Sequence, residues 1–365
     1  MGPARIAAIP VGPASAGRAA AMTRSFASRL IAWQRTHGRH DLPWQNTGDP
    51  YCVWLSEIML QQTQVATVIP YFLRFVEAFP DVRALAAAPI DRVLALWSGL
   101  GYYRRAHHLH DAAQRVVAEH GGDFPRDAAT LATLPGIGRS TAAAIAALAF
   151  GARTAILDGN VKRVLARHRG IAGFPGAPKV EARMWKVAEA LLPAADTAIY
   201  TQALMDLGAT LCTRSSPRCD VCPVASDCVT RNERRIDELP LPRPRRVLPQ
   251  RAVRVLLFER GGAILLEKRP PLGIWGGLWS LPELALEDDP RAFARAYFGA
   301  DAEPAAALAP IAHGFTHFAL TLHPQRMRVH DWPATAESPR RMWLGRDDAL
   351  GAALPAPIRK LLQSL

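Results

Sequence analysis

Four cysteines near the middle of the chain form a compact group of potential metal ligands. Cys212, Cys219, Cys222 and Cys228 follow the pattern C-x6-C-x2-C-x5-C. Thiolates select zinc or iron–sulfur clusters, and four of them complete the ligand set of either. Zinc fingers usually pair two closely spaced knuckles, whereas only the middle pair is close here, so the spacing favours a 4Fe-4S cluster. Two structural disulfides would suit a small secreted domain better than a chain of this type.

Two carboxylic acids precede this loop in contrasting surroundings. Glu57 lies within the apolar run at residues 54–59. If that face borders a pocket, poor solvation raises the pKa of Glu57 and makes it a proton donor near neutral pH; a solvent-facing glutamate is the commoner alternative. Asp158 precedes Gly159 and a predicted helix, whose amides and dipole would cap the carboxylate and keep it ionised. An acid and a fixed anion are what cleavage of a glycosidic bond requires.

A glycine-containing turn is predicted between two helical segments over residues 134–141. Gly136 and Gly138 allow positive φ angles and a close approach of the backbone to an anion. The helix that follows presents free amides, which can bind a phosphate. An ordinary turn between two helices is the alternative, and the cysteine loop downstream favours the phosphate-binding interpretation.

The first half of the chain is predicted to be all-α, because apolar residues recur at helical spacing between glycine and proline breaks. The predicted helices span residues 26–36, 53–79, 90–97, 106–119, 128–134, 141–150, 161–167, 180–192 and 200–211. Gln61 would then lie one turn beyond Glu57 on the same helix face, where its amide could probe stacked bases.

A change of composition marks the end of the helical half. Residues 231–251 hold seven arginines and four prolines, which is typical of a stiff, positively charged linker. Beyond it, segments 253–258 and 263–267 flank Gly261 and Gly262 and predict a β-hairpin. Further strands are expected at 319–323 and 342–344, with a helix at 358–362. The second half is therefore predicted to be α+β.

Composition limits the possible classes of protein. The chain has 365 residues, 49% of them hydrophobic, which is enough for two domains, and its net charge of +12 favours a nucleic acid partner. The longest apolar run, residues 142–150, is too short to cross a bilayer, and no signal peptide is recognised near Met1. We therefore expect no membrane association and a cytoplasmic location. Residues 1–23 are expected to be a disordered extension, with Met22 as a candidate start.

These motifs together resemble the adenine DNA glycosylase (MutY) family, within the helix-hairpin-helix superfamily that also contains endonuclease III. The resemblance runs from about Trp33 to Cys228. It rests on residues 42–44 (LPW), 54–63 (WLSEIMLQQT), 99–103 (GLGYY), the glycine turn, 156–163 (ILDGNVKR), 205–208 (MDLG) and the four cysteines. It implies that an adenine is flipped out of duplex DNA, that Glu57 protonates the purine, and that Asp158 stabilises the cationic sugar.

The resemblance also assigns roles to other residues. It implies that Gln61 and Tyr102 wedge into the base stack and that Arg39 and Trp44 border the adenine pocket. Bifunctional members of the superfamily carry a lysine just after the hairpin, where its amine forms a Schiff base with the sugar, but this chain has Ser140 there. A monofunctional glycosylase is therefore expected. Its expected DNA contacts are Gln61, Tyr102, Gly136, Gly138, Ser140 and Lys162.

The second half resembles a Nudix-like fold, most clearly over residues 265–282. A Nudix hydrolase would next carry a glutamate-rich helix that binds magnesium, and residues 283–300 contain no such helix. A recognition module is expected instead. In the family this module reads 8-oxoguanine opposite the adenine with a loop that matches Phe315, Thr316 and His317, where Thr316 takes a position that is frequently serine.

The predicted organisation is an all-α helix-hairpin-helix glycosylase domain at 24–230 with a cluster loop at 212–228, a linker at 231–251 and a Nudix-like α+β domain at 252–365. The expected partner is double-stranded DNA with adenine opposite 8-oxoguanine or G, bound by a monomer. Three alternatives are an endonuclease III-like lyase, an iron–sulfur DNA sensor without catalysis and a nucleotide hydrolase. Ser140 and the second domain argue against the lyase. The paired carboxyl groups argue against a sensor without catalysis, and the missing magnesium-binding helix argues against the nucleotide hydrolase.

Overall fold

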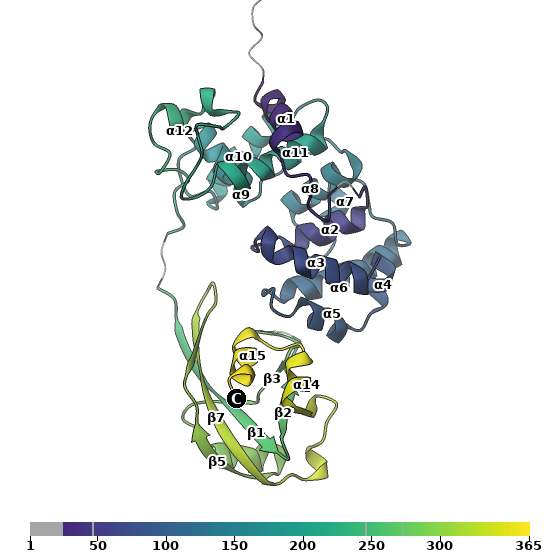
Figure 1. Ribbon diagram of the computed structural model, residues 1–365, viewed down its shortest axis with the longest axis vertical. Coiled ribbons are helices and arrows are strands. Elements are labelled where there is room, and N and C mark those ends of the chain that lie inside the picture. The colour runs from purple at the N-terminus through teal and green to yellow at the C-terminus, as the bar shows by residue number, and fades with distance from the viewer. Residues whose placement is uncertain (1–24, 46, 245–246, 272) are drawn as a thin grey trace, which may run out of the picture.

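The computed structural model describes residues 25–365 except 46, 245, 246 and 272. A helical domain and a β-rich domain follow one another along the long axis of the molecule (Figure 1). The extension predicted at residues 1–23 lies outside the described residues. No described helix combines the length and the apolar character needed to cross a membrane.

The helical domain contains α-helices, one π-helical turn (η1) and one 3-10 turn (η2). They are α1 (Phe26–His37), α2 (Pro50–Met59), α3 (Val65–Ala78), α4 (Val82–Ala87), α5 (Ile90–Trp97), α6 (Arg104–His120), α7 (Ala128–Leu131), α8 (Arg139–Phe150), α9 (Gly159–His168), α10 (Pro178–Ala190), α11 (Thr197–Asp206), η1 (Leu207–Leu211), η2 (Ala225–Asp227) and α12 (Val229–Asn232). The all-α prediction is confirmed for this part of the chain.

Two apolar cores hold these helices together, and α8 belongs to both. One core encloses Trp54, Phe75 and Trp97 between α2, α3, α5 and α6. The other encloses Leu30 and Tyr200 between α1, α9 and α11. The α8 residues Ala142, Ile145 and Ala146 face the first core, while Ala143 and Ala144 face the second. Small side chains on α8 let α2 and α11 pack against it, so the junction of the two cores lies along this helix.

The helix predicted at residues 53–79 is wrong in one respect, because the chain forms two helices there. Helix α2 ends at Met59, and α3 begins at Val65. Gln62 between them has a positive φ of 59°, which breaks the helical path. Gln61 therefore lies in a turn rather than on the face of the helix that carries Glu57. Apolar periodicity alone does not detect a break of this length.

The C-terminal domain is built on one mixed sheet. Its strands are β1 (Gln250–Arg260), β2 (Ala263–Lys268), β3 (Trp279–Ser280), β4 (Glu283–Leu284), β5 (Asp301–Ala307), β6 (Ile311–Gly314), β7 (Ala319–Asp331) and β8 (Arg341–Gly345). The main path runs β3-β2-β1-β7-β5, with β1 and β7 parallel. The predicted hairpin is confirmed, since Gly261 and Gly262 link β1 to β2 with φ of 56° and 80°. The α+β prediction is also confirmed, because the helical elements α13 (Pro290–Phe293), η3 (Ala294–Phe298), η4 (Ala334–Ala336), α14 (Arg346–Gly351) and α15 (Ala356–Gln363) complete this domain.

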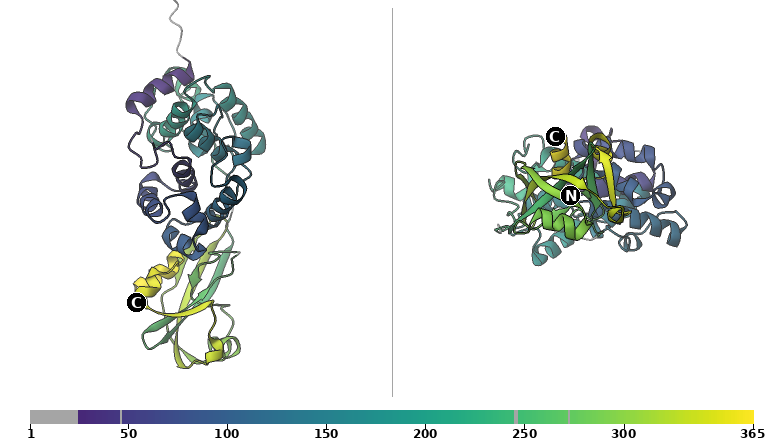
Figure 2. Two further views of the ribbon diagram at one scale, coloured as in Figure 1. Left: turned by 90° about the vertical axis from the view of Figure 1, so that its right-hand side faces the viewer. Right: turned by 90° about the horizontal axis from the view of Figure 1, so that it is seen from below.

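The two domains contact each other through α5, α6 and the turn between them. The Lys268 ammonium lies 2.6 Å and 2.7 Å from the two carboxylate oxygens of Asp91. A ring nitrogen of His107 lies 3.0 Å from the carbonyl oxygen of Gly276. Apolar residues of both domains, including Leu94 and Leu354, belong to one continuous core. Figure 2 shows α15 close to this junction.

Candidate active site and cluster loop

A cavity of about 1380 Å³ opens between the two cores of the helical domain. Its walls come from the end of α2, the turn after it, the starts of α8 and α9, and one side of α11. Six of the predicted site residues line it, namely Arg39, Trp44, Glu57, Gln61, Ser140 and Asp158. The structure therefore brings together side chains that are distant in the sequence, since Arg39 and Asp158 are 119 positions apart.

Glu57 lies near the end of α2 and borders this cavity. Burial raises the pKa of Glu57 to about 8, and the nearby Asp158 carboxylate adds to the effect. Its side chain is half-buried and borders the cavity. This pKa agrees with the poor solvation predicted from its apolar neighbours and favours the protonated carboxyl group at neutral pH.

Asp158 caps the N-terminus of α9, as predicted. Its carboxylate accepts a hydrogen bond of 2.7 Å from the Val161 amide. Burial nevertheless raises the pKa of Asp158, against the lowering effects of the Val161 and Asn160 amides and of Arg163 and Lys162. Capping was expected to keep this carboxylate ionised; the amides and cations do favour the anion, but burial has the larger effect on the pKa because the site is deeper than a surface N-cap. The two carboxyl groups still differ, since amides and cations favour the anion only at Asp158.

Ser140 lies at the start of α8, close to Asp158. Its hydroxyl oxygen accepts a hydrogen bond of 2.9 Å from the Leu157 amide. This contact ties the helix that follows the glycine turn to the strand-like segment that ends in Asp158. Ser140 thus holds the backbone beside the proposed anion and offers no amine to the cavity.

Arg39 lies at the cavity wall, and its guanidinium is bound by a buried carboxylate. Its Nε and Nη2 atoms lie 2.8 Å and 2.6 Å from Asp206 Oδ1. Gln34 and Gln202 donate hydrogen bonds of 3.0 Å and 2.8 Å to the same carboxylate. Sequence reasoning did not single out Asp206, although its match to the MDLG motif was a signal. Trp44 is buried and packs edge-on against Phe72, with ring centroids 5.3 Å apart.

The glycine turn that was predicted to bind phosphate contains two glycines of different backbone conformation. Gly136 has a φ of 75°, whereas Gly138 has an ordinary negative φ of −85° and caps α8 without a side-chain partner. Both glycines are exposed. Gln61 donates a hydrogen bond of 3.4 Å to the carbonyl of Gly136, so the turn after α2 lies beside the glycine turn. Lys162 was expected to meet phosphate; in this structure its ammonium lies 2.6 Å from a carboxylate oxygen of Glu181.

Tyr102 lies on an exposed turn between α5 and α6. Its φ is 49° and 47% of its surface is accessible. It does not line the cavity, but the Arg105 guanidinium packs over its ring at 5.6 Å. Arg105 also bonds to the turn that carries Gln61, so the two predicted wedge residues are joined by a residue that sequence reasoning missed.

The four predicted metal ligands converge on one small pocket. Cys212, Cys219, Cys222 and Cys228 line it together with apolar side chains and three arginines. No three Cys, His, Asp or Glu side chains in the described part of the chain are grouped for a single metal ion, whereas a 4Fe-4S cluster places its thiolates farther apart. Arg167 donates a hydrogen bond of 3.5 Å to the Cys212 sulfur and one of 2.6 Å to the Thr213 carbonyl. The pocket fits a cluster of thiolate-bound iron.

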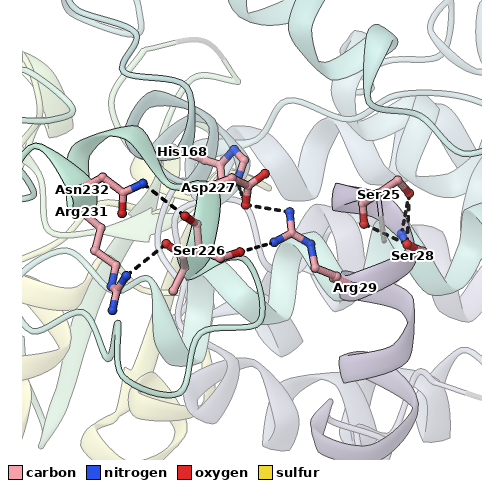
Figure 3. Close-up of polar contacts among 9 residues, drawn as sticks. Ser25, Ser28, Arg29, His168, Ser226, Asp227, Arg231 and Asn232 are labelled. Atoms are coloured by element: carbon pink, nitrogen blue, oxygen red, sulfur yellow. Dashed lines mark hydrogen bonds and ion pairs between the residues drawn. The ribbon is translucent and has the colours of Figure 1, made fainter. Parts of the chain in front are cut away.

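Helix α1 also contacts this loop, as Figure 3 shows. Arg29 donates hydrogen bonds of 2.7 Å to the Ser226 hydroxyl and of 2.7 Å to the Asp227 carboxylate. A ring nitrogen of His168, at the end of α9, lies 3.2 Å from the same carboxylate. Two elements of the second core thus hold the loop just before its last cysteine, Cys228.

The predicted lesion-reading loop lies in the other domain. Phe315 stacks on Phe318 with ring centroids 4.5 Å apart and contacts Trp275 at 5.4 Å. Thr316 and His317 are exposed. None of the three lines the large cavity.

Comparisons with known proteins find matches for the helical domain, the cysteine loop and the C-terminal domain. The helical domain matches the HhH-GPD superfamily of base excision DNA repair proteins over residues 55–190. The cysteine loop matches the iron–sulfur binding domain of endonuclease III over residues 212–228, and residues 253–364 match the NUDIX domain. The solved structure of a thermostable thymine-DNA glycosylase is similar with a TM-score of 0.52 and 29% identity, covering 57% of this chain and 95% of that one. Fold and site define a helix-hairpin-helix DNA glycosylase with a 4Fe-4S cluster and a Nudix-like domain.

Relatives along the whole length narrow the class further. Adenine DNA glycosylase of Buchnera aphidicola subsp. Acyrthosiphon pisum is 34% identical over 345 residues, which is 94% of this chain and 98% of that protein. Adenine DNA glycosylase of Homo sapiens is 33% identical over 409 residues, covering 95% and 75% of the two chains. The chain belongs to the adenine DNA glycosylase family. Membership confirms the predicted enzyme class, hydrolysis of N-glycosyl bonds in base excision repair, and the predicted 4Fe-4S cofactor.

Proposed function

We propose that the protein is a monofunctional glycosylase that removes adenine mispaired with 8-oxoguanine or G in duplex DNA. The observation that carries this proposal is the pairing of Glu57 and Asp158 at one cavity, beside a turn suited to phosphate. A base inside a stacked duplex cannot reach such a cavity, so the adenine must be extruded first. The relatives named adenine DNA glycosylase support the choice of base.

Each carboxyl group has a distinct task in the proposed reaction. Glu57, held neutral by burial, gives its proton to a ring nitrogen of adenine. The bond from the sugar carbon to adenine then breaks, and its electron pair leaves with the protonated base. The Asp158 carboxylate, fixed by the Val161 amide, stabilises the positive sugar. Water adds to the sugar cation and returns a proton to Glu57.

Ser140 supports the monofunctional part of the proposal. A strand-cutting glycosylase needs an amine that attacks the sugar, and the position after the glycine turn offers a hydroxyl bound to the Leu157 amide. Lys162 is the nearest candidate amine on α9, and it is paired with Glu181. Base release without strand scission is therefore expected.

The C-terminal domain is proposed to read the base opposite the adenine, through the loop at Phe315, Thr316 and His317. The segment that would carry the metal-binding glutamates of a Nudix hydrolase, α13 and η3, holds Arg291 and Arg295 instead and no glutamate. The absence of glutamates from α13 and η3 supports binding of a lesion base rather than nucleotide hydrolysis. We propose that the enzyme acts as a monomer in the cytoplasm.

Single-turnover base release tests the proposal. Duplexes with adenine opposite 8-oxoguanine, G or T should be processed in that order of decreasing rate. Strand breaks should require alkali, and Glu57→Gln should release adenine about 10²–10⁴-fold more slowly, the usual worth of a general acid. Equal scission with and without alkali would remove the monofunctional claim, and an unchanged rate for Glu57→Gln would remove the assigned acid.

A further inference from the structure

Arg105 is a buried cation between the two turns that carry Gln61 and Tyr102. It is the second residue of α6, and only 8% of its surface is accessible. An isolated buried guanidinium is costly, so its hydrogen bonds must be supplied by the protein. All of the hydrogen-bond partners of its two terminal nitrogens come from the two turns and the helix end before the first of them, while its buried Nε has no partner among the described residues.

One nitrogen of Arg105 bonds to the chain around the end of α2. Nη1 donates hydrogen bonds of 3.0 Å, 2.8 Å and 2.6 Å to the carbonyl oxygens of Ile58, Met59 and Gln61. Two of these carbonyls lie at the end of α2, and the Ile58 carbonyl also accepts a hydrogen bond of 3.4 Å from the Gln61 amide. Arg105 therefore caps α2 from the side and fixes the direction in which the chain leaves it.

The other terminal nitrogen reaches both turns. Nη2 donates hydrogen bonds of 3.1 Å to the Thr63 hydroxyl, 3.3 Å to the Leu100 carbonyl and 3.2 Å to the Gly101 carbonyl. Leu100 and Gly101 immediately precede Tyr102, whose positive φ needs an external constraint. A single planar group thus connects residues 58–63 with residues 100–101.

Two aromatic rings complete the environment of Arg105. The guanidinium carbon lies 5.2 Å from the centre of the Trp97 ring and 5.6 Å from that of Tyr102. Trp97 in turn donates a hydrogen bond of 3.1 Å to the Gly101 carbonyl. The backbone and the ring of Tyr102 are therefore both tied to the same cation.

We propose that Arg105 is a positioning residue that sets Gln61 and Tyr102 at the spacing needed to open the base stack at the mispair. The inference rests on the proposed function, because a wedge has a use only where a base is extruded. Arg105 touches no reacting atom. It acts through the two turns, and its planar fork is what lets one side chain serve both.

The test compares Arg105→Lys with the wild-type protein. Lysine keeps the charge but has three donors on one nitrogen and no fork, so it cannot hold both turns. We expect single-turnover release of adenine opposite 8-oxoguanine to fall by about 10–100-fold, the range that a misplaced contact produces. Fluorescence of 2-aminopurine placed beside a non-cleavable 2′-fluoro adenine should rise less on binding, because the stack is opened less. Arg115→Lys, on the exposed side of the same helix, should match the wild-type protein in both readouts.

Two further comparisons separate positioning from a loss of folding. On a Tyr102→Ala background, Arg105→Lys should add little further loss, since the two changes remove one function. If Arg105→Lys fails to fold, Thr63→Val removes a single acceptor and should lower the fluorescence change, while Thr63→Ser restores it. Full additivity with Tyr102→Ala, or equal signals for Thr63→Val and Thr63→Ser, would overturn the inference.

The outcomes also distinguish this inference from the proposed function. If the wild-type protein releases no adenine from any duplex, the proposed function is wrong, and the proposed role of Gln61 and Tyr102 as a wedge is wrong as well. If the wild-type protein releases adenine and Arg105→Lys opens the stack and releases it equally well, only the role of Arg105 is wrong.

Discussion

Glu57 shows how catalysis and stability oppose each other within a single residue. Burial raises its pKa from 4.5 to about 8 in the folded protein. Between these pH values the folded chain holds a proton that the unfolded chain has released. The free energy of unfolding is therefore highest at low pH, falls as the pH rises from about 4.5 to about 8, and is no longer changed by this group at higher pH. In the proposed reaction, this retained proton is the one that Glu57 transfers to adenine.

Glu57→Gln should therefore gain stability while it loses activity. A neutral amide carries no ionisation penalty, so we expect the melting temperature above pH 8 to rise by several degrees relative to the wild-type protein. Thermal unfolding below and above that pH measures the effect. Glu77→Gln, at an exposed site on α3, serves as the control and should show no such pH-dependent difference. A wild-type melting curve independent of pH would contradict the assigned pKa.

Residue-level prediction from the sequence was accurate where the environment is local. The apolar neighbours of Glu57 indicated its desolvation, and the residues after Asp158 indicated an N-cap. The burial that raises the pKa of Asp158 could not be predicted from the sequence, because its depth depends on helices distant in sequence. Arg105 and Asp206 were missed for the same reason, since their partners lie tens of residues away.

Among the structural elements, the glycine turn separates two glycines that look equivalent in sequence. Gly136 has a φ of 75°, and a side-chain carbon there would lie 2.8 Å from the Cβ of His108. Gly138 has a negative φ and no atom within 4 Å of such a carbon. Only the first position requires glycine for folding.

Gly136→Ala should destabilise the protein by about 1 kcal/mol or more, because alanine disfavours this φ and meets His108. Gly138→Ala should change stability by less, which makes it the matched control. Melting temperatures of the two variants, recorded without DNA, provide the measurement. A larger loss for Gly138→Ala would show that the turn has a different shape.

The cluster loop depends on a contact with α1 that the cysteine spacing could not reveal. Arg29, whose side chain is 19% exposed, forms hydrogen bonds to Ser226 and Asp227 next to Cys228. Surface ion pairs usually contribute about 0–1 kcal/mol, but this one restrains the chain beside a metal ligand.

Arg29→Met should speed loss of the cluster without abolishing folding. We expect the iron–sulfur absorbance to decay several-fold faster under a chelator or oxygen, because the segment before Cys228 opens more often. Arg35→Met removes a more exposed ion pair, to Asp196, from the same helix and should leave the decay rate unchanged. Identical decay in both variants and the wild-type protein would show that the contact does not restrain the loop.

For the whole molecule, the sequence indicated two parts of different class and a basic linker, but it gave no sign of how the parts meet. Helical and strand periodicities are local, whereas the shared core of α5, α6 and the C-terminal domain depends on surface shape. The turn from Ser98 to Tyr102 lies at this contact. The Tyr103 hydroxyl donates a hydrogen bond of 3.2 Å to the Leu354 carbonyl and accepts one of 3.3 Å from the Gly99 amide.

Tyr103→Phe should uncouple the turn from the C-terminal domain. One hydrogen bond is worth about 1 kcal/mol, so the preference for adenine opposite 8-oxoguanine over G should fall by up to about fivefold, because the C-terminal domain, which we propose reads the lesion, no longer supports the turn beside Tyr102. The ratio of single-turnover rates on the two duplexes measures this effect.

Tyr71→Phe is the matched control for this effect. The Tyr71 hydroxyl donates a hydrogen bond of 2.9 Å to the Ser98 carbonyl of the same turn, but this contact lies wholly within the helical domain. Its loss should cost similar stability and slow both substrates alike, so the ratio stays constant. If both variants changed the ratio equally, the turn would matter for local rigidity alone, and the two domains would act independently in choosing the substrate.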